Sequence, residues 1–102
     1  MKNAIATVSL NVGEASFPLA SDINAICDLE AEFGEGINQI IARFQNAELL
    51  RMTDVRRYLR VMLRSNEKPM EIQQADDICA IAGIHTCSAA VTDHILSMFR
   101  KD

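Results

Sequence analysis

The sequence has few of the residue types that mark specialised small proteins. Its 102 residues include no tryptophan, one tyrosine, two prolines and three cysteines. Three cysteines are too few for a disulfide framework, and their odd number favours a reducing compartment. We therefore expect Cys27, Cys79 and Cys87 to be small buried hydrophobic residues. Without tryptophan, the core must consist of isoleucine, leucine, valine, methionine and phenylalanine.

Long apolar runs and excess positive charge are also absent. No apolar run approaches the roughly 20 residues that a membrane-spanning helix needs, and the N-terminus lacks the apolar stretch of a signal peptide. The formal net charge is −4, which argues against broad nucleic-acid binding because that binding needs many cations to neutralise phosphates. These observations predict a cytoplasmic protein with no membrane contact, for which nucleic acid is a disfavoured partner.

The motifs that carry catalysis or metal binding are missing as well. Cys79, His85 and Cys87 are close in sequence, but a structural zinc site needs four ligands with pairs about two to four residues apart. We expect His85 and His94 to lie at the surface or to be partly buried. Gly34-Glu35-Gly36 follows an expected helix instead of linking a strand to a helix, so it indicates a helix end and not a dinucleotide loop. We expect no metal, no cofactor and no enzymatic activity.

The overall composition is that of a globular protein. Apolar residues make up 49% of the chain and charged residues 24%, which is ordinary usage for a folded domain. The length favours one domain over residues 1–102. We expect a β-hairpin over residues 4–20 and a helical part over residues 21–102.

The hairpin prediction comes from a turn and an alternating pattern. Gly13-Glu14 is suited to a two-residue turn with glycine at its first central position. This turn fixes the register, and the residues that then share the apolar face are Val8, Leu10, Val12, Ala15, Phe17 and Leu19. Pro18 has no N–H, so the outer edge of the second strand should be unpaired at that point. The apolar face must lie on the helices, because an isolated hairpin is barely stable.

Apolar residues recur at helical spacing in five later segments. The expected helices cover residues 22–33, 37–46, 54–65, 71–82 and 87–100. Ser21, Thr53-Asp54 and Thr86 are expected to begin the first, third and fifth of them, and Gly34 and Gly83 to end the first and fourth. The predicted fold class is therefore α+β: an N-terminal antiparallel β-hairpin followed by four to five α-helices, packed as one small, mostly helical domain.

Charge is distributed unevenly along the chain. Residues 22–35 contain five acidic residues and no basic one, whereas residues 51–64 contain five arginines and one aspartate. Arg56, Arg60 and Arg64 are four residues apart and share one helix face, with Arg57 at its edge. The two segments are either solvated faces that pair with each other or include a basic strip that docks an acidic partner. Nucleic acid is a weaker alternative, because no aromatic residues interleave with the arginines.

The last expected helix has more apolar residues than one buried side requires. Val91, Ile95 and Met98 are expected in the core, whereas Leu96 lies off this stripe and is a candidate for exposure. An exposed apolar patch on a small protein marks a partner surface. The residues predicted to contact a partner are Arg56, Arg57, Arg60, Arg64, Leu96 and Phe99.

The order of these segments is similar to that of a known family. The segments that carry the similarity are residues 6–10, 17–19, 26–34, 37–44, a Thr53-Asp54 helix start before residues 59–64, and a two-helix end. The most specific element is the stretch Leu29-Glu30-x-x-Phe33-Gly34. Over nearly its whole length, the chain resembles the small tail assembly chaperones of gene transfer agents and related tailed phages.

The resemblance implies a non-enzymatic role. Such proteins are thought to bind the long, aggregation-prone tape-measure protein and to help tail-tube subunits assemble around it, and they are generally absent from the finished particle. Two alternatives stay open: a structural tail component retained in the particle, and a small regulatory protein that binds nucleic acid through its arginines. The sequence also leaves homo-oligomer formation open.

Overall fold

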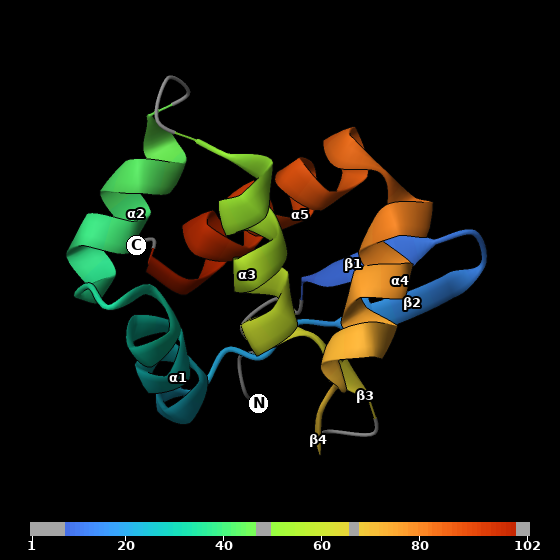
Figure 1. Cartoon of the computed structure of the whole chain (residues 1–102), viewed down its shortest axis with the longest axis horizontal. Coiled ribbons are helices and arrows are strands. Elements are labelled where there is room, and N and C mark those ends of the chain that lie inside the picture. Colours follow the sequence, from blue (N-terminus) through green and yellow to red (C-terminus); the bar gives the residue numbers. More distant parts are fainter. Residues whose placement is uncertain (1–7, 47–49, 66–67, 100–102) are drawn as a thin grey trace, which may run out of the picture.

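A computed structural model describes residues 8–46, 50–65 and 68–99, with the backbone alone at position 99 (Figure 1). Within these residues the order of elements is β1 (Ser9–Val12), β2 (Ala15–Pro18), α1 (Ile23–Phe33), α2 (Ile37–Gln45), α3 (Met52–Met62), β3 (Arg64–Ser65), β4 (Lys68–Pro69), α4 (Ile72–Ala82) and α5 (Ile84–Phe99). The predicted α+β class, a hairpin followed by helices, is confirmed. Positions 4–7 of the predicted hairpin and position 100 of the last helix lie outside the described residues.

The β1–β2 hairpin has the predicted register. Leu10 lies opposite Phe17, and Val12 lies opposite Ala15 across the turn. Gly13 has a φ of 60°, a value that glycine adopts without the steric cost of a Cβ atom. Leu10 is fully buried and contacts between β1 and both α4 and α5 place the apolar face on the helices. Ala15 is the exception among the six predicted residues, because it lies exposed beside the turn.

The outer edge of β2 becomes paired immediately after Pro18. Leu19 forms an isolated antiparallel bridge with Leu63, and the Ala20 N–H donates to the Met62 carbonyl at 2.8 Å. The residues at the end of α3 therefore pair with the edge of the chain that begins at Leu19, one residue past the proline. This pairing also explains why α3 ends at Met62 and not at residue 65, since Leu63 must be extended to form the bridge.

Two helices begin earlier than their threonines predicted. α3 starts at Met52, where the Arg51 carbonyl accepts hydrogen bonds from the N–H groups of Asp54 and Val55 at 2.9 and 3.1 Å. α5 starts at Ile84, directly after Gly83, which has a φ of 92°. Gly83 ends α4 by donating to Cys79 and begins α5 by accepting from Cys87. Thr53 and Thr86 therefore lie inside helices and are not N-caps.

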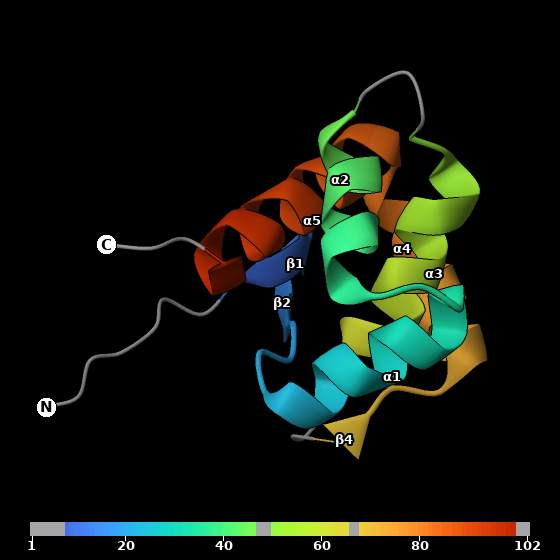
Figure 2. The same cartoon turned by 90° about the vertical axis from the view of Figure 1, so that its left-hand side faces the viewer.

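The core is centred on α3, which contacts α1, α4 and α5 (Figures 1 and 2). Tyr58 of α3 is fully buried, and its ring packs edge-on against Phe44 and His94 at centroid distances of 5.2 and 5.7 Å. The hairpin lies beside α4 and α5, away from α1 and α2 (Figure 1).

Within the described residues no single helix is long and apolar enough to cross a membrane, and only α4 and α5 taken together, bent by 113°, meet that test of length and composition.

The prediction that His94 lies at the surface or is only partly buried was wrong. Its side chain has 0% exposure, with Nδ1 2.7 Å from the Tyr58 hydroxyl and Nε2 3.4 Å from the Ser21 hydroxyl. These partners come from α3 and from the residues before α1, so the local pattern on α5 did not reveal them. Removal from water lowers the pKa of His94 from 6.5 to about 4, against an opposing hydrogen bond with the Ala20 backbone. His94 is therefore a neutral part of the core at pH 7.

The predicted burial of the three cysteines is confirmed for only some of them. Cys87 is buried and Cys79 is half-buried, but Cys27 is exposed on α1, so its predicted burial was wrong. In α1, the neighbouring positions that face the core are Ala25 and Leu29. Cys27 is two residues from each of them and therefore lies on another side of the helix.

Candidate partner-binding site

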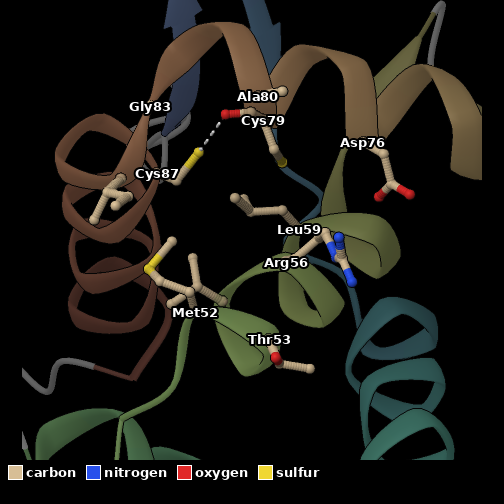
Figure 3. A pocket seen from close by; sticks show the side chains of 11 residues that line it. Met52, Thr53, Arg56, Leu59, Asp76, Cys79, Ala80, Gly83 and Cys87 are labelled. Carbon is tan, nitrogen blue, oxygen red and sulfur yellow. Dashed lines mark hydrogen bonds between the residues drawn. The ribbon is translucent and has the colours of Figure 1, made fainter.

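A hollow of about 320 Å³ lies between α3, α4 and the beginning of α5 (Figure 3). Its volume falls at the lower end of the range for ligand pockets. The residues that line it are Met52, Thr53, Val55, Arg56, Leu59, Asp76, Cys79, Ala80, Gly83, Ile84 and Cys87. Gly83 separates α4 from α5 at one end of the hollow, so the sharp change of direction there gives the site its shape.

One edge of the hollow is apolar and exposed. Met52 is 40% exposed and Ile84 is 61% exposed, and each is the first residue of its helix. The sequence did not predict either residue as part of a site. The predicted third and fifth helices begin at residues 54 and 87, so Met52 and Ile84 fall in the predicted connecting segments. A glycine directly before Ile84 was the available signal, since the chain could resume a helix there.

The floor of the hollow includes two uncharged thiols. The Cys87 thiol donates toward the Cys79 carbonyl at 3.5 Å. Burial raises the pKa of Cys79 to about 12, with a smaller contribution from neighbouring Cys87, and burial also raises the pKa of Cys87. The thiolate is the reactive form of cysteine, so at pH 7 these side chains act as apolar lining together with Leu59.

The opposite edge of the hollow is polar and is lined by Arg56 and Asp76. Asp76 accepts two hydrogen bonds from Arg60, at 2.7 Å from Nε and 2.6 Å from Nη2. These hydrogen bonds hold the pKa of the Asp76 carboxyl below its usual value. Arg56 is exposed and lines the same edge, where its charge also helps to lower the pKa of Asp76, yet its side chain makes no hydrogen bond or ion pair with any residue in the described part of the chain.

The other predicted arginines are used inside the fold. Arg57 turns toward α1, where it pairs with Glu32 at 3.2 Å and lies 4.5 Å from the centroid of the Phe33 ring. It also approaches buried Asp54 at 3.4 Å. Arg64 turns back to the end of α3 and donates to the carbonyls of Val61 and Leu63. The four arginines therefore point to three different places, and the acidic and basic segments meet at Arg57 and Glu32.

A comparison with protein-family models decides the family. The model described as "Phage tail tube protein, GTA-gp10" matches residues 6–100. The chain belongs to the GTA-gp10 family. No curated protein and no solved structure matches. The predicted membership in a gene transfer agent and phage tail family is thus confirmed, and it gives the chain a tail-related role, whereas the chaperone role stays a prediction.

Leu96, another predicted contact of this GTA-gp10 protein, lies away from the hollow. Leu96 is 52% exposed, as expected, on the outer side of α5. It is twelve residues from Ile84, which corresponds to roughly 18 Å along the helix. The Phe99 side chain lies outside the described part of the structure. The roles of Arg56, Arg57, Arg60, Arg64, Leu96 and Phe99 in partner binding stay predictions.

The Arg60–Asp76 pair should link α3 to α4 in the GTA-gp10 fold. Both side chains are about a quarter to a third exposed, so we expect a double-mutant cycle of Arg60→Ala and Asp76→Ala to give a coupling free energy of only about 0.5–1 kcal/mol. Urea unfolding at low and high NaCl measures it, and added salt should reduce it. A coupling of zero at low salt would contradict a stabilising pair.

A metal-binding role gains no support from the described residues of this family member. Among them, no three His, Cys, Asp or Glu side chains are grouped so that they could hold a metal ion. Cys79 and Cys87 are neighbours, but His85 is exposed. The site is an apolar hollow whose polar edge is lined by Arg56 and Asp76.

Proposed function

We propose that this chain is a non-enzymatic assembly chaperone for a phage-like tail, and that it holds the tape-measure protein in the cytoplasm while tail-tube subunits assemble. The observation that carries the proposal is the hollow between α3, α4 and α5 with its exposed edge of Met52 and Ile84. Exposed apolar surface on a small protein marks a binding site for another protein. Membership in the GTA-gp10 family supports a partner among phage-like tail proteins.

The alternative function, a structural component retained in the tail, is supported less well than the chaperone role by the exposed apolar side chains of the molecule. A subunit in a tube contacts neighbours through two different faces, and standard interfaces cover about 800 Å² per partner. Two of them would take about a quarter of the 6554 Å² accessible surface. Among the described residues, the large exposed apolar side chains outside the hollow, at Ile23, Ile72, Ile81 and Leu96, are distributed over three helices.

Nucleic-acid binding is also favoured less. Such binding needs several cations free to contact phosphates on one face. Of the four predicted arginines, Arg57, Arg60 and Arg64 are engaged by other groups of the fold. Arg56 alone is an insufficient basis for a phosphate-binding strip.

Co-expression with the tape-measure protein encoded by the same tail genes tests the proposal. We expect the chain to increase the soluble fraction of the tape-measure protein and to elute with it in size-exclusion chromatography. An unrelated soluble protein of similar size, expressed from the same vector, is the control. Unchanged solubility together with separate elution would refute the proposed function.

A further inference from the structure

We infer that the hollow between α3, α4 and α5 binds an amphipathic α-helix of the tape-measure protein. Apolar side chains of that helix are inserted between Met52 and Ile84, and one of its carboxylates pairs with Arg56. This inference rests on the proposed function, because that function supplies the class of partner. It adds the docking site, the secondary structure of the bound segment and the sign of its charge.

The shape of the hollow favours side chains presented by a helix. Its volume of about 320 Å³ is enough for a few apolar side chains but not for a folded partner. Its walls are formed by α3, α4 and α5 (Figure 3), so it offers no strand edge to which an extended peptide could add. A helix lying across such a groove inserts residues spaced by three or four positions, which emerge from one of its faces.

The lining of the hollow determines which side chains would enter it. Leu59, Cys79 and Cys87 supply apolar atoms, and both thiols are protonated at pH 7 because burial raises their pKa values. Charged or strongly polar side chains would lose water there without gaining a partner. Leucine, isoleucine, methionine or phenylalanine on the partner helix would therefore occupy the interior.

The polar edge determines the preferred charge of the partner. Arg56 and Asp76 line this edge, and both oxygens of Asp76 already accept hydrogen bonds from Arg60. The Arg56 guanidinium therefore has no carboxylate of its own among the described residues, although the chain as a whole is negative. A glutamate or aspartate next to the inserted apolar residues would complement Arg56, whereas a lysine or arginine would be repelled.

Filling the hollow is the first part of the test. Ala80 lines it and is exposed, so Ala80→Phe should occupy the hollow without disturbing the core. Ala31→Phe is the matched control, because Ala31 is an exposed alanine within α1. Overlapping synthetic peptides that tile the tape-measure protein are the probes, with affinity followed by fluorescence anisotropy. We expect Ala80→Phe to weaken the best helical peptide by on the order of tenfold or more, and Ala31→Phe to leave it unchanged.

Reversing the charge at the edge is the second part. Arg56→Glu should weaken an acidic amphipathic peptide by on the order of tenfold, whereas Arg56→Lys should stay within roughly threefold of the wild type. A matching glutamate-to-lysine change in the peptide should restore binding to Arg56→Glu. Equal weakening of acidic and basic peptides would overturn the assigned charge.

Photocrosslinking during co-expression separates failure of this site from failure of the proposed function. A benzoylphenylalanine at position 84 should crosslink to the tape-measure protein, whereas the same residue at position 23 or 96 should not. Ile23 and Leu96 are exposed controls outside the hollow. Crosslinks from 23 or 96 alone, with the complex intact, would overturn the site but not the chaperone role. Absence of a complex with the wild type would overturn both.

Discussion

Replacing Tyr58 by alanine should destabilise the fold by about 3–5 kcal/mol, the usual cost of removing a large aromatic side chain from a core. Tyr58 is fully buried at the centre of α3 and packs against Phe44 and His94. Small domains have only about 5–15 kcal/mol of stability in total. The variant should therefore lose a large part of its free energy of unfolding, measured by urea-induced unfolding followed by circular dichroism.

Two further variants serve as comparisons: Tyr58→Phe removes only the hydroxyl group, and Phe17→Ala removes a ring elsewhere in the fold. Tyr58→Phe keeps the ring but leaves His94 Nδ1 without its partner at 2.7 Å, so the expected loss is about 1–3 kcal/mol. Phe17→Ala removes a ring that is only half-buried at the hairpin, so it should cost less than Tyr58→Ala. If Tyr58→Ala were no more destabilising than Phe17→Ala, the central position of Tyr58 would be wrong.

Acid should destabilise the protein through His94. The pKa of His94 is about 4 in the folded state and 6.5 in the unfolded state. Well above pH 6.5 the imidazole is neutral in both states and has no effect on the pH dependence. Below pH 6.5 the unfolded state takes up the proton first, so the free energy of unfolding should fall by about 1.4 kcal/mol per pH unit, or about 3 kcal/mol by pH 4.

The interval between pH 6.5 and 5 isolates this effect, because carboxylates titrate mainly at lower pH. Urea unfolding across that interval should show the slope in the wild type and in His85→Gln, since His85 is exposed. His94→Gln should lower the stability at pH 7 but remove most of the slope. An unchanged slope in His94→Gln would mean that another group is responsible.

The hairpin could be predicted in detail because two independent signals agreed. Alternating apolar residues and a turn glycine specified the same pairing, and the structure has it from Ser9 opposite Pro18 to Val12 opposite Ala15. Gly34 and Gly83 likewise marked the ends of α1 and α4. These features depend on local backbone geometry, which sequence reports directly.

The hollow could not be predicted because it depends on where two helices begin. Thr53 and Thr86 were interpreted as caps, yet the carbonyls of Arg51 and Gly83 begin α3 and α5. The arginines show a similar limit. Their spacing places Arg56, Arg60 and Arg64 on one face, but spacing does not determine their partners. Arg60 pairs with Asp76 of α4, which is a tertiary contact, whereas Arg64 donates to carbonyls at the end of its own helix.

Quantitative mass spectrometry of purified tail particles, compared with lysate from cells that are assembling tails, tests the chaperone role most directly. The proposed function predicts that the chain is abundant in the lysate, bound to the tape-measure protein, and absent from finished particles. Detection of the chain in particles at a fixed ratio to the tail-tube subunit would contradict the chaperone role and would identify it as a structural component of the tail.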